Sequence, residues 1–84
     1  MEQKIRRDRS MGDNLRRLRL AAGLSQEKLR AELQRRGCDI GRTTYAKYEA
    51  GELNIRASVL IELKALYACP YEEFFADLPG GKTE

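Results

Sequence analysis

Apolar residues recur at helical spacing in five stretches of the 84-residue chain, and glycine or proline separates most of these stretches. Apolar side chains that recur every three or four residues lie on one face of an α-helix. The pattern therefore predicts an all-α fold in which five amphipathic helices form one compact domain. A chain of this length buries only a small core, so association with a second copy would help to stabilise it.

The first two predicted helices have clear ends. Ser10 can cap the first helix, and Gly23 ends it because glycine adopts the left-handed conformation easily. Ser25 caps the second helix, which ends at Gly37, and Ile40 is expected to anchor the following turn in the core. The inward-facing residues of these two helices are Met11, Leu15, Leu18, Ala22, Leu29 and Leu33.

The third predicted helix, between Gly41 and Gly51, has two unlike sides. At about 100° per residue, Tyr45 and Tyr48 lie on one side, where core packing is favoured over stacking on bases. The opposite arc carries small, polar and basic residues, namely Arg42, Thr43, Ala46, Lys47 and Ala50. A helix can enter the DNA major groove only if one face is free of the core and carries hydrogen-bonding side chains. The third helix meets this condition.

Two more helices are predicted near the carboxyl end. The fourth spans residues 57–67, and Pro70 suits the first turn of a fifth. The fifth helix has one broad apolar face, formed by Tyr71, Phe74, Phe75 and Leu78. Part of this face would close the core, and the rest would be exposed unless a twofold mate covers it. These four residues are therefore a predicted homodimer interface, and the alternative is that both phenylalanines belong to the core.

Charge is distributed unevenly along the chain, whose net charge is +3. Residues 1–56 hold 14 Lys or Arg and 8 Asp or Glu, whereas residues 57–84 hold 2 and 5. A basic front and an acidic back are typical of a nucleic-acid binder, although a solvated surface with a chance bias gives the same outline. Residues 1–9 are expected to form a flexible basic arm, or else a frayed extension of the first helix. A domain over residues 10–79 and a disordered tail over residues 80–84 follow. The arm carries Lys4, Arg6, Arg7 and Arg9.

Several classes of protein are disfavoured. No apolar run is long enough for a transmembrane span, and the basic amino terminus lacks the apolar segment of a secretion signal. The chain has no histidine, and Cys38 and Cys69 lack metal-type spacing and a general base nearby in sequence. We therefore expect a cytoplasmic protein with two reduced thiols, no metal, no cofactor and no enzymatic activity.

Two motifs carry a family resemblance. The sequence Leu-Ser-Gln-Glu-x-Leu runs from Leu24 to Leu29, and Arg-x-Thr-x-x-x-x-Glu-x-Gly runs from Arg42 to Gly51. With the closing segment at residues 69–75, the chain resembles the phage-repressor and Cro-like helix-turn-helix family, also called Xre-type regulators. It departs from the family pattern in two ways. Residues 34–39 lengthen the second helix or its turn, and Arg30 stands where such domains usually have alanine.

The resemblance implies a role for individual residues. Those expected to contact bases are Arg42, Thr43 and Lys47. Those expected to contact DNA phosphates are Gln26, Thr44, Asn54 and Arg56. Thr44 could instead pack against the second helix. Arg19 and Glu49 match positions that form a partly buried ion pair, which would orient the third helix.

These features together predict a sequence-specific DNA-binding transcriptional regulator, with repression favoured and activation as the alternative. It would bind double-stranded DNA as a homodimer, with two copies of the third helix in successive major grooves. No site for a small-molecule effector is expected. The alternative is a protein-interaction module, or an antitoxin-like protein that binds a partner through the same fold. The polar and basic arc of the third helix favours DNA, because an interaction helix should present apolar residues there.

Overall fold

The computed structural model describes residues 11–76, which form four α-helices and one 3₁₀ helix with no strand among them. The elements are α2 (Met11–Ala21), α3 (Gln26–Arg35), α4 (Arg42–Ala50), α5 (Ala57–Tyr67) and η1 (Tyr71–Phe75). The all-α prediction is confirmed for this part of the chain. The residues of the predicted basic arm, Leu78 and the predicted tail lie outside the described residues.

The prediction of a fifth α-helix is wrong, because η1 is a five-residue 3₁₀ helix. Pro70 precedes η1, and Ala76 leaves it with φ −59° and ψ 137°, which is not a helical conformation. Only five residues therefore lie between two non-helical positions. Helical segments as short as this often adopt the 3₁₀ conformation.

The carboxyl-terminal ends of α2, α3 and α4 follow the sequence signals, whereas Ser10, the predicted cap of the first helix, lies outside the described residues. Gly23, Gly37 and Gly51 come directly after the last turn of these helices, and each has a positive φ. After α3, the backbone N–H of Cys38 donates to the Leu33 carbonyl at 2.8 Å, which satisfies a carbonyl that has no partner within the helix. Helix α5 differs, because the left-handed position after it is occupied by Ala68, with φ 54°.

One hydrophobic core joins all five elements. Its fully buried members are Leu15, Leu29, Leu33, Ile40, Tyr45, Tyr48, Val59, Leu63 and Phe74. Met11 and Leu18 are half-buried, whereas Ala22 is exposed, so its predicted place in the core stripe is wrong. Helix α2 ends at Ala21, and Ala22 lies in the turn that follows it, although its backbone N–H still donates to the Leu18 carbonyl at 3.1 Å.

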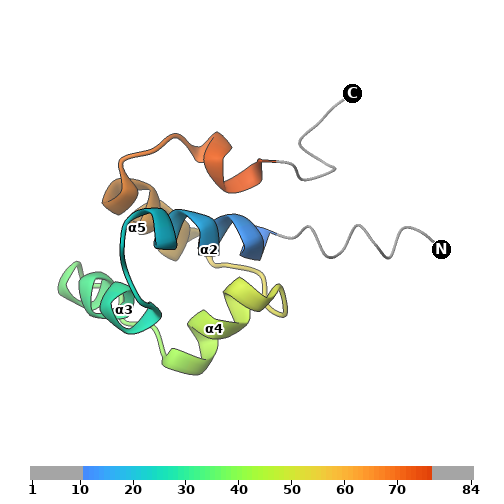
Figure 1. Cartoon of the computed structure of the whole chain (residues 1–84). Helices are drawn as coiled ribbons and strands as arrows, with labels where there is room; N and C mark the ends of the chain where they lie inside the picture. Colours follow the sequence, from blue (N-terminus) through green and yellow to red (C-terminus); the bar gives the residue numbers. More distant parts are fainter. Residues whose placement is uncertain (1–10, 77–84) are drawn as a thin grey trace.

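Helix α4 packs against both α2 and α3, and α2 also contacts η1 (Figure 1). The segment between Leu33 and Ile40 is divided between the last turn of α3 and the connection to α4. Arg30 is half-buried, and its Nε donates to the Ile40 carbonyl at 3.1 Å. The long side chain thus ties α3 to the connection that leads into α4.

Helices α2 and α4 meet through their backbones at Gly12. A Cβ atom added to Gly12 would lie 2.7 Å from the Tyr48 carbonyl oxygen and closer still to the Glu49 carbonyl oxygen. Both distances are shorter than a carbon–oxygen contact allows, and the opposing atoms are backbone atoms. Only glycine permits this separation between the two helices.

Candidate nucleic-acid interface

The outer face of α4 is formed by Arg42, Thr43, Ala46, Lys47 and Ala50. Ala46 is half-buried, and the other four residues are exposed. Within residues 11–76, the side chains of Arg42, Thr43 and Lys47 form no hydrogen bond or ion pair. Their donors are therefore available to a ligand outside the domain.

The inner side of α4 carries a closed polar network centred on Glu49. Arg19 on α2 forms a bidentate ion pair with it, with Nε to Oε2 at 2.7 Å and Nη2 to Oε1 at 3.0 Å. The Tyr45 hydroxyl donates to Oε2 at 2.6 Å, and Gln26 Nε2 on α3 donates to Oε1 at 3.1 Å. The side chains of Arg19 and Glu49 are only 9% and 5% exposed, so this pair is shielded from solvent.

Hydrogen bonding keeps the pair charged despite its burial. Burial alone would raise the pKa of Glu49, but the hydrogen bonds from Arg19, Tyr45 and Gln26 outweigh it and lower the pKa below its ordinary value. The hydrogen bond to Glu49 raises the pKa of Arg19 further. Burial also raises the pKa of the Tyr45 hydroxyl, which therefore stays protonated and donates.

The network fixes α4 relative to two other helices. Arg19 comes from α2 and Gln26 from the first turn of α3, and both bond to the same carboxylate on α4. Arg19 Nη1 also donates to the Leu24 carbonyl at 2.9 Å, which anchors the connection between α2 and α3. The part played by the Tyr45 hydroxyl was not predicted from the sequence. Its position four residues before Glu49 on one helix was the available signal.

Gln26 and Arg42 line one pocket, although they were predicted to contact different parts of DNA. Its other lining residues are Ser25, Glu27 and Arg30. Ser25 caps α3 as predicted, since its Oγ accepts from the Lys28 backbone N–H at 3.0 Å. One N–H of the Gln26 amide is bonded to Glu49, so its carbonyl oxygen and second N–H remain for another partner. The start of α3 and the start of α4 thus share an open polar hollow.

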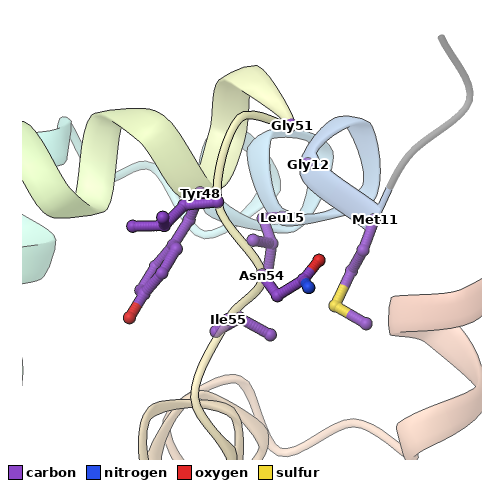
Figure 2. A pocket seen from close by; sticks show the side chains of 8 residues that line it. Met11, Gly12, Leu15, Tyr48, Gly51, Asn54 and Ile55 are labelled. Carbon is purple, nitrogen blue, oxygen red and sulfur yellow. The ribbon is translucent and has the colours of Figure 1, made fainter. Parts of the chain in front are cut away.

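Asn54 and Arg56 lie beyond the opposite end of α4, in the connection to α5, and both are exposed. Asn54 lines a separate pocket of about 200 Å³, together with Met11, Gly12, Leu15, Tyr48, Gly51, Leu53 and Ile55 (Figure 2). Arg56 is the residue that precedes α5. Thr44 is half-buried on α4 itself. The residues proposed for phosphate contact are thus spread along α4 and beyond both of its ends.

Of the predicted dimer interface, the structure describes Tyr71, Phe74 and Phe75, and these three side chains differ in burial. Phe74 is fully buried in the core of the monomer, so its assignment to a dimer interface is wrong. Tyr71 and Phe75 are 40% and 42% exposed. Buried Asn14 on α2 holds η1 in place, because its Nδ2 donates to the carbonyls of Phe74 at 3.0 Å and Ala76 at 2.9 Å. No motif in the sequence pointed to this role of Asn14, whose only signal was its place beside inward-facing Leu15.

A family model described as a helix-turn-helix domain matches residues 10–74, which is most of the chain. The chain belongs to this helix-turn-helix family. The match includes α2, α3, α4 and α5, and thus the outer face of α4. Neither the curated proteins nor the solved structures include a significant match. No helix in residues 11–76 is long and apolar enough to cross a membrane.

Proposed function

We propose that this helix-turn-helix protein is a sequence-specific DNA-binding regulator of the phage-repressor type, and that it acts as a repressor. Helix α4 would enter the major groove and contact bases through Arg42, Thr43 and Lys47. The observation that carries the proposal is the outer face of α4, whose polar side chains are exposed and form no hydrogen bond within residues 11–76. A protein that occupies the groove excludes other proteins from the same DNA, which is the physical basis for assigning repression.

Contacts to the DNA backbone would come from both ends of α4. The exposed start of α3, with Gln26 beside Arg42, suits a phosphate because backbone N–H groups at a helix start attract anions. Thr44, Asn54 and Arg56 would contact further phosphates. The basic residues of the amino-terminal arm would add affinity that is independent of sequence. These arm residues are Lys4, Arg6, Arg7 and Arg9.

The regulator would bind as a homodimer through η1 and the residues that follow it. The exposed rings of Tyr71 and Phe75 support this assignment, and Leu78 would join them. A twofold axis at η1 would place two copies of α4 in successive major grooves, about 34 Å apart. Sedimentation at high micromolar concentration, with and without a selected duplex, tests this assembly. A single copy per duplex under both conditions contradicts it.

Selection from a library of randomised duplexes, with the full chain as bait, tests the DNA-binding proposal. We expect an enriched, twofold-symmetric sequence and an affinity that falls steeply with salt. For each neutralised phosphate, the logarithm of the association constant should fall by about 0.9 per tenfold increase in salt concentration. Deletion of residues 1–9 should reduce this slope without changing the enriched sequence. A pool without enrichment, combined with little dependence on salt, would favour the alternative of a module that binds a protein partner.

A further inference from the structure

We infer that α4 selects guanine-bearing half-sites, in which Arg42 and Lys47 each donate to the major-groove edge of a different guanine. This inference rests on the proposed DNA-binding function and specifies which bases are recognised. It follows from the hydrogen-bonding character of the outer face of α4, from the closed network behind it, and from the positions of its long and short side chains.

The charged side chains on the outer face can only donate hydrogen bonds. Arg42 and Lys47 are exposed and carry donors without acceptors. Guanine presents two acceptors in the major groove, O6 and N7, whereas adenine presents one acceptor and one donor. Adenine is usually contacted by Asn or Gln, and the outer face of α4 has neither. Guanine is therefore the base that matches both side chains.

The only carboxylate on α4 is withheld from the bases. Glu49 would be the natural acceptor for the amino group of cytosine, but its side chain is only 5% exposed. Both of its oxygens already accept hydrogen bonds from Arg19, and each accepts one more, from Tyr45 or Gln26. Glu27 on α3 shares a pocket with Arg42 but forms no ion pair with it, so the guanidinium is left free to bond elsewhere.

The order of long and short side chains sets the spacing of the guanines. Arg42 and Lys47 lie at the two edges of the outer face, about 140° apart around the helix and about 7.5 Å apart along it. That rise corresponds to about two base-pair steps of DNA. Ala46 and Ala50 lie between the two long side chains and let the helix backbone approach the bases. The methyl groups of Thr43 and Ala46 suit contact with the methyl group of thymine.

The enriched half-site should therefore contain two guanines about two to four base pairs apart, allowing for side-chain reach, with a thymine near them. Repeating the selection with two variants assigns each guanine. Arg42→Ala should lose the preference at one position, and Lys47→Ala at the other. Arg16→Ala is the matched control, because Arg16 is an exposed arginine on α2 without a partner in residues 11–76, and it should select the unchanged sequence.

Replacing each selected guanine with 7-deazaguanine removes N7 alone and tests the contact directly. We expect affinity for the full chain to fall about tenfold at each of the two positions, with a much smaller effect of the same replacement in the flanks. An enriched sequence without fixed guanines, or unchanged affinity after the replacements, overturns this inference while DNA binding stands. A pool without any enrichment overturns the proposed function and this inference with it.

Discussion

The two sides of α4 differ in what their polar side chains are bonded to. On the inner side, the Glu49 carboxylate accepts from Arg19, Tyr45 and Gln26 and is shielded from solvent. On the outer face, Arg42 and Lys47 are exposed and have no bonding partner within residues 11–76. A fully bonded network rigidifies the elements that it joins, and unbonded donors remain available to a ligand. One helix thus combines a fixed orientation with a free recognition surface.

The comparison also separates orientation from stability. A buried ion pair is often no more stabilising than well-packed apolar residues, yet breaking it leaves an uncompensated charge. The bidentate ion pair of Arg19 with Glu49 constrains the orientation of α4 relative to α2. The inner side should therefore govern folding, and the outer face should govern binding.

Glu49→Gln is expected to have the largest effect on folding. It removes the charge that compensates Arg19, so the free energy of unfolding should fall by about 3–5 kcal/mol, measured by urea denaturation. The matched control is Glu52→Gln, because Glu52 is exposed just beyond α4 and its side chain forms no bond within the described residues. Equal stability of the two variants would show that the inner network does not hold α4.

Lowering the pH tests the charge of the same carboxylate, through a comparison of the wild-type protein with Glu49→Gln. Because folding lowers the pKa of Glu49 below 4.5, its contribution is present above that pH and is lost as the pH falls through the folded-state value. The stability difference between wild type and Glu49→Gln should therefore be full at neutral pH and shrink in acid. Denaturation curves from neutral pH downwards measure it. A difference that stays constant would contradict the charged state assigned to Glu49.

Gly12→Ala is expected to lower the free energy of unfolding by about 2–3 kcal/mol, because the added methyl group meets backbone atoms of α4. Gly41→Ala is the control, since its nearest contact would be the Thr44 hydroxyl at 3.9 Å, and it should change stability by less than about 1 kcal/mol. Thermal denaturation compares the two variants. If both are tolerated equally, the close contact between α2 and α4 is not required.

Ala68→Gly should raise stability by about 1 kcal/mol without touching either side of α4. Ala68 adopts the left-handed conformation after α5, with φ 54°, which favours glycine. Urea denaturation measures the gain, and DNA affinity should stay unchanged. The variant then provides a stabilised background in which loss of binding can be separated from loss of folding. A decrease in stability would contradict the strain assigned to this position.

Lys47→Ala should have the smallest effect on folding, a change of less than about 0.5 kcal/mol, because the side chain is exposed and unbonded in the described structure. Its affinity for the selected duplex should nevertheless fall. Glu49→Gln is therefore expected to lower the stability of the fold, and Lys47→Ala to lower the affinity for DNA. A Lys47→Ala variant that unfolds early would remove the distinction between the two sides.

The sequence by itself determined most helix boundaries and the division of α4 into an inner side that packs in the core and an exposed outer face. The predicted fourth helix, residues 57–67, coincides with α5, and Gly37 and Gly51 follow α3 and α4 as expected. Tyr45 and Tyr48 lie in the core, as their spacing predicted. These features depend on residues within a few positions of one another, so local periodicity and end signals are sufficient to find them.

Only the tertiary structure decided which groups meet across the fold. Asn14 bonds to carbonyls about sixty positions away, and Gly12 meets the backbone of α4. The amide of Gln26 reaches Glu49, and Phe74 turns inward where one shared apolar face was predicted. Each of these contacts depends on how separate helices approach one another. That approach is set by the packing of the whole core, which the pattern of any single helix does not contain.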